Sequence, residues 1–357
     1  MRKAICLALA FIIMVSSLCA CSNSDKVTDE MFALDTIITF SVYDNNKALA
    51  KETIDKCKRE ITRLEKLFSA TLEGSDVYNI NHSNGEKIAV SYETATLIKR
   101  ALAMSKSCDG AFDISVYPLV KLWGFDSKKY NVPDKSEITD ALRFVNYLDI
   151  TADNNDNYVT LKKGMSIDLG AVAKGYIAEV VQGILLEKDV HHGIINLGGL
   201  VVTYSDSDKN DEDFTIGIEY PDTGEVFAQF DTQIPFTVTS GSYQRFFEEN
   251  GVRYHHIIDP KLGSPAESDI SSVTVIGFDG TYCDALSTAF FVMGIDKTIE
   301  YVKTHTDDED NKYSLIILSK NKDELYITSD IAESDFTIYK EFENKIKINV
   351  IDVNRIS

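Results

Sequence analysis

Segments that favour helices and segments that favour strands are grouped along this chain instead of alternating regularly. Apolar residues recur at helical spacing over Lys47–Leu67 and Ser91–Ser107, and a further helix is expected over Ala171–Leu186. Short strand-like runs dominate from His191 to Val275. A doubly wound parallel sheet needs strands and helices that alternate, whereas grouped elements predict an α+β fold.

The remaining elements are shorter and fit the same fold class. An amphipathic segment is expected at 138–148, an acidic loop at Ser205–Asp213 and a helix over Asp284–Phe291. Further strands are predicted at Ile37–Tyr43, Tyr158–Leu161, Ile167–Leu169, 314–318 and 324–328. Because no internal repeat is found, residues 31–340 are expected to form one domain, followed by a tail over 341–357.

The amino terminus has the pattern of a bacterial export signal. A short basic start precedes an apolar run over Ala4–Val15, which is too short to span a bilayer comfortably. The run leads to Leu-Cys-Ala-Cys, ending at Cys21, which resembles a lipobox. Residues 1–20 are therefore predicted to be removed, and 21–30 to be a lipidated cysteine and polar tether at the extracytoplasmic face of a bacterial cell membrane. The alternative is a plain secretory signal in which Cys21 happens to lie near the cleavage point.

Charge and cysteine content argue against several classes of protein. The formal net charge of −20 disfavours binding to nucleic acid through its phosphates. After Cys21 the remaining cysteines are Cys57, Cys108 and Cys283, an odd number without metal-like spacing. Neither a disulfide framework nor a zinc site is expected, and these three residues are predicted to be small buried hydrophobic groups.

Adjacent histidines end a strand-like alternation in TSGSYQRFFEENGVRYHHIIDPKLGSPA, residues 239–266. Imidazole titrates near neutral pH, so His256 is a candidate general base, and Asp259 could orient it or cap the turn at Pro260. His255 and His256 face opposite sides of an alternating strand, so at most one is expected to face a site. The alternatives are a surface histidine beside a structural one, or a metal pair, which adjacent positions favour least.

Two glycine-containing segments are candidates for ligand binding. SIDLGAVAKGY, residues 166–176, joins a short strand to a helix start, where backbone N–H groups suit an anion and Lys174 would add positive charge. The alternative is a glycine-relieved turn with a solvated lysine. GAFD, residues 110–113, would let a flat ligand approach the backbone, or would be a turn leading into an aromatic core.

Asp284 and Thr288 are four residues apart in a predicted helix, so their oxygens lie on one face. A carboxylate and a hydroxyl form a hard-oxygen pair of the kind that Mg²⁺ accepts beside phosphate oxygens and water. The alternative is that Asp284 caps the helix and Thr288 is buried.

Taken together, these segments resemble the ApbE family, the FAD:protein FMN transferases. The resemblance is carried by GAFDISVYPLVKLWGF, SIDLGAVAKGYIAE, the histidine stretch and SVTVIGFDGTYCDALSTAFFVMG, and it extends from Met31 to about residue 330. It implies a T-fold-type α+β domain with mostly antiparallel sheets flanked by helices. It also implies Mg²⁺-dependent transfer of FMN from FAD to a Thr or Ser hydroxyl of an exported redox protein, with release of AMP.

The resemblance further implies roles for individual residues. His256 would deprotonate the acceptor hydroxyl, and Mg²⁺ would be bound by the backbone carbonyl of Ala171 together with Asp284 and Thr288. Contacts with FAD are implied at Met31, Ala111, Phe112, Asp113, Asp168, Lys174 and Ile257. The partners would be FAD, an acceptor redox protein with an FMN-binding domain, and the membrane through a lipid anchor.

One departure from the family pattern bears on how FAD is bound. Thr71 stands where many members have an aromatic residue, and this loss would alter FAD affinity or the balance between transfer and hydrolysis. Two other functions stay open: an FAD pyrophosphatase that gives FMN and AMP with water as the acceptor, and a non-enzymatic FAD-binding lipoprotein.

Overall fold

The computed structural model describes residues 25–206, 213–305, 312–332 and 336–353, so the predicted signal peptide and Cys21 lie outside the described residues. Within them a nine-stranded sheet has the order β1-β2-β6-β7-β10-β13-β14-β15-β17. Its strands are β1 (Asp25–Ala33), β2 (Thr36–Asp44), β6 (His192–Asn196), β7 (Leu200–Ser205), β10 (Phe236–Gly241), β13 (Ile270–Gly277), β14 (Tyr313–Ser319), β15 (Glu324–Thr328) and β17 (Lys347–Ile351). Neighbouring strands are antiparallel except for β15 and β17.

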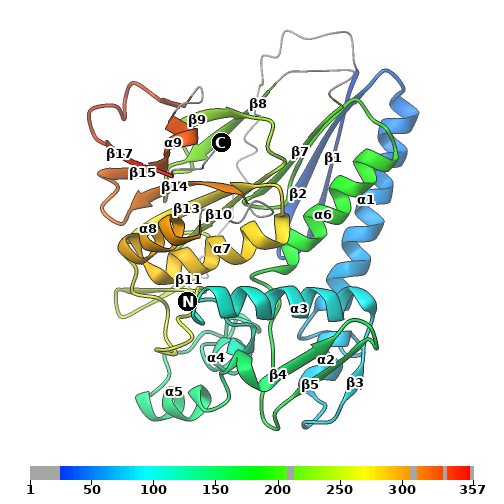
Figure 1. Ribbon diagram of the computed structural model, residues 1–357, viewed down its shortest axis with the longest axis vertical. Helices are drawn as coiled ribbons and strands as arrows, with labels where there is room; N and C mark the ends of the chain where they lie inside the picture. The colour runs from blue at the N-terminus through cyan, green and yellow to red at the C-terminus, as the bar shows by residue number, and fades with distance from the viewer. Residues whose placement is uncertain (1–24, 207–212, 306–311, 333–335, 354–357) are drawn as a thin grey trace, which may run out of the picture.

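Helices cover one face of this sheet, and a smaller sheet packs against part of the other (Figure 1). The covering helices are α1 (Lys47–Phe68), α6 (Ala173–Glu187), α7 (Gly280–Met293) and α8 (Ile295–Thr304). The smaller sheet is formed by β8 (Phe214–Glu219), β9 (Val226–Thr232) and β16 (Thr337–Ile338). The main hydrophobic core therefore lies between the large sheet and the helices, and a second core lies between the two sheets.

A second group of elements lies beneath the helical layer, at the bottom of Figure 1. It contains α2 (Asp76–Asn81), α3 (Tyr92–Ser107), α4 (Tyr117–Leu122) and α5 (Lys135–Leu142), the short helices η1 (Ile114–Val116) and η2 (Tyr147–Asp149), and a sheet of β3 (Ile88–Ala89), β5 (Tyr158–Leu161) and β4 (Ile150–Asp153). Two further elements are the hairpin of β11 (Phe246–Glu249) with β12 (Val252–His255), and α9 (Ser329–Ala332).

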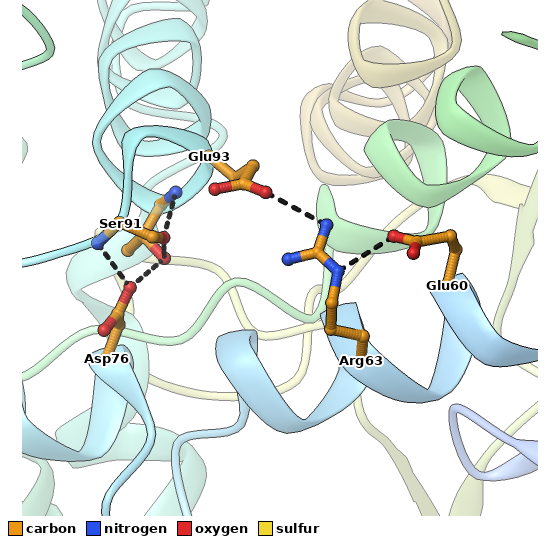
Figure 2. Close-up of polar contacts among 6 residues, drawn as sticks. Glu60, Arg63, Asp76, Ser91 and Glu93 are labelled. Carbon is orange, nitrogen blue, oxygen red and sulfur yellow. Dashed lines mark hydrogen bonds and ion pairs between the residues drawn. The ribbon is translucent and has the colours of Figure 1, made fainter.

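Polar contacts join the first three helices of the chain, as Figure 2 shows. Arg63 in α1 donates to Glu60 in the same helix at 2.8 Å and to Glu93 in α3 at 2.9 Å. Asp76, at the start of α2, accepts a hydrogen bond from the backbone N–H of Ser91 at 2.8 Å. Ser91 caps α3, so these contacts fix the start of α3 against both α1 and α2.

The fold class and the elements with clean periodicity were predicted correctly. The structure is α+β with mostly antiparallel sheets, as expected. Helices α1 and α3 and strand β5 agree with the predicted ranges to within one residue. Cys57, Cys108 and Cys283 are free and buried, which confirms their prediction as small hydrophobic residues. In the described part of the chain, no helix is both long enough and apolar enough to cross a membrane.

Four predicted segments are wrong in part. Residues 25–30, expected in the tether, belong to β1, which pairs with β2. The tail contains β17, which pairs in parallel with β15. The 138–148 segment is instead α5, which begins earlier because Asp134 and Glu137 form a capping box, and it ends before η2. Ile167–Leu169 forms no strand.

Candidate active site

Helices α6 and α7 cross at two glycines, and this crossing forms one side of the candidate site. A Cβ on Gly175 would lie 2.2 Å from the carbonyl oxygen of Gly280, and a Cβ on Gly280 would lie 2.8 Å from that of Gly175. Both separations are too short for any side chain, so only glycine allows the two backbones to approach this closely. The start of α6 consequently lies beside the first turns of α7 (Figure 1).

Asp284 lies at this crossing and is only 3% exposed. Its Oδ2 accepts a hydrogen bond from the backbone N–H of Gly175 at 2.8 Å, and its Oδ1 is 3.9 Å from Nζ of Lys174. The residue that caps α7 is Asp279, whose Oδ1 accepts from the N–H of Tyr282 at 2.7 Å. The capping alternative for Asp284 is therefore wrong, because its carboxylate faces the start of α6.

The hydrogen bond between Gly175 and Asp284 leaves a backbone carbonyl without its helical partner. In a regular helix the N–H of Gly175 would donate to the carbonyl of Ala171, four residues earlier. Among the described residues, no other backbone N–H donates to this carbonyl. The oxygen of the half-buried Ala171 is thus available as a ligand beside the carboxylate of Asp284.

Thr288 adds a third oxygen on this side of the site. It is half-buried, lies one helical turn after Asp284, and its hydroxyl makes no hydrogen bond with the described residues. The described residues contain no group of three or more His, Cys, Asp or Glu side chains that could hold a metal ion, so an ion here would rely on carboxylate, hydroxyl, carbonyl, phosphate and water oxygens. That donor set suits Mg²⁺, which keeps water and phosphate among its ligands.

Charged residues from three helices brace the crossing. Arg100 of α3 donates to both carboxylate oxygens of Glu179 in α6, at 2.7 and 2.9 Å, and to Asp279 at 2.6 Å. Glu179 also accepts from the backbone N–H of Thr281 at 2.7 Å. Burial and the neighbouring Glu179 carboxylate raise the pKa of Asp279 to about 6. This network ties α3, α6 and α7 together close to Asp284.

The segment before α6 is a turn held by side chains instead of a strand. The amide of Asn81 accepts from the N–H of Ile167 at 2.6 Å and donates to its carbonyl at 2.9 Å, so these groups are not free to pair with a strand. Asp168 then accepts from the N–H of Gly170 at 2.5 Å. Burial raises the pKa of Asp168, although the positive charges of Arg245 and Lys174 act in the opposite direction.

The side chains of the GAFD segment are used for structure. Asp113 accepts from the N–H of Ser115 at 2.8 Å, from its hydroxyl at 2.6 Å and from the N–H of Tyr147 at 3.0 Å, which caps η1. Ala111 and Phe112 are buried in the main core. A contact between these residues and FAD stays a prediction, and the carboxylate of Asp113 already has three donors.

The two histidines have different environments. His255, at the end of β12, is buried, with Nε2 3.1 Å from the carbonyl of Ala266 and its ring edge-on to Phe291. The backbone N–H and Nδ1 of the half-buried His256 each lie 3.1 Å from the carbonyl of Arg245. A carbonyl can only accept, so this contact assigns the proton to Nδ1 and leaves Nε2 as the basic nitrogen.

Burial, together with the positive charges of Lys174 and Arg245, lowers the pKa of His256 to about 3. The imidazole is therefore neutral at physiological pH, and Nε2 can accept a proton. Lys174 influences both His256 and Asp168 and lies 3.9 Å from Asp284. The structure thus places these four predicted site residues in one electrostatic neighbourhood.

Three other predicted or noted positions lie around this neighbourhood. Met31 is half-buried against the main core, and Ile257 is buried in it, so their implied contacts with FAD stay predictions. Thr71 is exposed in the loop after α1. The last residue of α1, Phe68, packs edge-on against Tyr176 in the first turn of α6, with 5.6 Å between ring centroids, so the Thr71 loop follows directly on a contact with the start of α6.

The sequence did not predict a role for Arg245 or Asn81, or the contact between Gly175 and Gly280. The only available signal for Arg245 was its place as the single cation between Thr239 and Gly251. Asn81 acts on a segment 86 residues away, and no local pattern indicates such a contact. Gly280 is likewise far from Gly175 in the chain, so only the fold shows that they meet.

The family model described as "ApbE family" matches residues 34–310, which is well over half of the chain. The chain belongs to the ApbE family. The family expected from the sequence is thereby confirmed.

Proteins that are similar to this chain match it over most of its length. One from Klebsiella pneumoniae (strain 342), named FAD:protein FMN transferase, is 34% identical over 290 residues, which cover 80% of this chain and 87% of the relative. One from Treponema pallidum (strain Nichols), with the same name, is 30% identical over 322 residues, covering 83% and 88%. The crystal structure of the ApbE protein from Thermotoga maritima has a TM-score of 0.76 at 32% identity and covers 90% of this chain and 99% of that one.

Proposed function

We propose that this ApbE family member is an FAD:protein FMN transferase. The names of its relatives from Klebsiella pneumoniae and Treponema pallidum support this activity. The observation that carries the proposal is an oxygen-lined cation site at Asp284 together with an unprotonated nitrogen of His256. Lys174 links the two, because its Nζ lies 3.9 Å from Asp284 and its positive charge lowers the pKa of His256. A cation site and a base together suit the cleavage of a pyrophosphate by a hydroxyl group.

The acceptor in this proposal is a Thr or Ser hydroxyl of an exported redox protein with an FMN-binding domain. Nε2 of His256 takes the hydroxyl proton. The acceptor oxygen forms a bond to the phosphorus of the FMN half of FAD, and the bond from that phosphorus to the bridging oxygen breaks. AMP leaves with the electron pair of the broken bond, so the products are acceptor-bound FMN and AMP.

The metal in this proposal is Mg²⁺, held by the backbone carbonyl of Ala171, the carboxylate of Asp284 and the hydroxyl of Thr288. When bound, it would neutralise negative charge on the phosphates. Lys174 adds a fixed positive charge at the start of α6, where the helix dipole also favours an anion. The positive charge of Lys174 and of the helix start would thus attract the negatively charged pyrophosphate of FAD.

We also propose that lipid on Cys21 anchors the protein at the extracytoplasmic face of a bacterial cell membrane. The leader sequence supports this location. Replacing Cys21 with Ser in the full chain is expected to move the protein from the membrane fraction to the soluble fraction and to abolish labelling by palmitate. Unchanged membrane retention of Cys21→Ser would contradict the anchor.

One assay separates the proposed activity from its two alternatives. The mature protein is incubated with FAD, Mg²⁺ and a candidate acceptor domain, and flavin fluorescence is measured in a denaturing gel while AMP is quantified. Covalent flavin on the acceptor, with AMP, is the expected result. AMP without labelling would indicate an FAD pyrophosphatase, and FAD binding with neither product would indicate a non-enzymatic binding protein.

A further inference from the structure

We propose that the guanidinium of Arg245 binds the phosphate of FAD that is attacked and transferred, a role that rests on the proposed transferase function. No role was assigned to this residue from the sequence. Its place beside the candidate base, its unused donors and its partial burial together carry the assignment.

Arg245 holds the base through its main chain. Its carbonyl accepts from both the backbone N–H and Nδ1 of His256, at 3.1 Å each. The attacking hydroxyl has to lie at Nε2 of His256, and the phosphorus that it attacks has to lie directly beyond it. The Arg245 carbonyl lies at the Nδ1 edge of the ring and so fixes the direction in which Nε2 points. The charge of the Arg245 side chain acts on both His256 and Asp168, so the guanidinium lies in the same electrostatic neighbourhood as the base.

The side chain of Arg245 has donors to spare. One terminal nitrogen donates to the carbonyl of Phe125, and the other lies 3.9 Å from Oδ2 of Asp35, which is beyond hydrogen-bonding distance. One of the five N–H groups of the guanidinium thus makes a hydrogen bond within the described structure. The side chain is only 33% exposed, so it has lost much of its water and has gained only the Phe125 carbonyl as an acceptor among the described residues.

Asp35 does not compete strongly for this cation. It is 57% exposed and already pairs with Lys128 at 3.1 Å, so water and a second cation balance its charge. Two oxygens of a phosphate can accept hydrogen bonds from the planar fork of N–H groups of arginine. The partly buried guanidinium therefore has the chemistry of an unfilled phosphate site.

Lys174, the other positively charged residue of the site, lies on the cation side and not in the chain segment that orients the base. Its Nζ lies 3.9 Å from Asp284, at the start of α6, and so belongs to the cation side of the site. Both Lys174 and Arg245 act on His256, but of these two only Lys174 faces the carboxylate of Asp284. This difference assigns the FMN phosphate to Arg245 and leaves the AMP phosphate to the opposite side.

The test compares binding of the two products. Arg245→Gln is expected to weaken FMN binding by about tenfold or more, since a charge-assisted hydrogen bond is lost, while AMP binding changes less than about twofold. Arg245→Lys, which keeps the charge, should recover part of the FMN affinity. Arg253→Gln is the control, because Arg253 lies in the hairpin that follows Arg245 but pairs with Asp222 and Glu248 at the surface.

The kinetics of flavin transfer are measured in the same experiment, so that failure of the Arg245 proposal can be told apart from failure of the proposed transferase function. The same substitution should lower kcat for transfer as well as raise the KM for FAD, since the attacked phosphate carries more charge in the transition state. Unchanged FMN binding in Arg245→Gln, or equal losses for FMN and AMP, would overturn the role of Arg245 whether or not the wild type transfers flavin. Selective loss of FMN binding in a wild type that never labels an acceptor would leave the phosphate site in place and remove the transferase function.

Discussion

The two sides of the candidate site are held by different kinds of structure. On the cation side, Asp284 lies between two packed helices whose backbones meet at Gly175 and Gly280. On the base side, His256 follows a short two-stranded hairpin and is held by two hydrogen bonds to one carbonyl, that of Arg245. The backbones at Gly175 and Gly280 are in direct contact, so a larger residue there would push the helices apart. Among the described residues, the side chain of His256 is held only by the Arg245 carbonyl, so it can be replaced without moving a helix.

The supports of the two sides differ in the same way. The helix crossing is braced by the ion pairs of Arg100 with Glu179 and Asp279. The hairpin rests on stacked aromatic rings, among them Phe247, which lies 4.9 Å from Tyr130 between ring centroids. Changes that disturb the helix crossing should therefore reduce both stability and activity, whereas changes of side chain on the base side should reduce activity at neutral pH with little effect on stability.

The largest expected effect is on the base side. His256→Ala should slow transfer to the acceptor by about 10²–10⁴-fold, because no other neutral base occupies its place, while FAD binding and the free energy of unfolding change little. Rates of labelling at saturating FAD and thermal unfolding curves measure this. His82→Gln, on an exposed histidine of the lower group of elements, is the control and should match the wild type. Undiminished labelling by His256→Ala would remove His256 from the mechanism.

On the cation side, Gly175→Ala should destabilise the protein by about 1–3 kcal/mol and reduce activity, because its Cβ would meet the carbonyl of Gly280. The matched control is Gly183→Ala in the same helix, where nothing lies within 4 Å of the added Cβ. That change should stabilise the protein by about 0.5–1 kcal/mol, since alanine favours helix. Equal denaturation midpoints for the two variants would show that the crossing is not as tight as described.

Asp284→Asn separates charge from packing on the cation side. The amide oxygen can still accept from Gly175, so the crossing should survive, but the loss of negative charge should raise the Mg²⁺ concentration for half-maximal transfer by about 10–100-fold. Activity titrated with Mg²⁺ and a parallel unfolding measurement test this. An unchanged Mg²⁺ requirement would refute the assignment of Asp284 as a ligand.

The smallest expected effect is the dependence of stability on pH. Burial lowers the pKa of His256 to about 3, so below about pH 6.5 the unfolded chain binds a proton that the folded protein does not. Between pH 7.5 and 5 the wild type should therefore lose up to about 2 kcal/mol more unfolding free energy than His256→Gln, with solvent at the half-buried ring reducing this value. Parallel pH profiles for the two proteins would mean that the pKa of His256 is not lowered.

Local patterns were sufficient to predict much of the fold. Helices α1 and α3 follow from repeated apolar spacing, and β5 from alternation, because these signals are contained within the segment itself. Ile167–Leu169 has the composition of a strand but is held by Asn81, which is far away in the chain. The predicted start of α7 was late because Asp284 resembled a cap, while Asp279 is the residue that caps it.

In the candidate site, too, local spacing predicted some residues, whereas others depend on contacts between distant parts of the chain. Asp284 and Thr288 belong to one helix, so their spacing indicated a shared face. The carbonyl of Ala171 becomes available only because Gly175 donates to Asp284, and this contact spans 109 residues. The orientation of His256 depends on the hairpin that returns the chain to Arg245. Contacts of this kind depend on packing and could not be read from sequence periodicity.

The ratio of AMP released to flavin bound on the acceptor tests the central claim most directly. Both are measured in one reaction of the wild-type protein with FAD, Mg²⁺ and an exported redox protein that carries an FMN-binding domain. If His256 activates a protein hydroxyl, the two products appear in a ratio of about one to one. AMP that accumulates at the same rate with and without the acceptor, while the acceptor stays free of flavin, would contradict the proposed transfer.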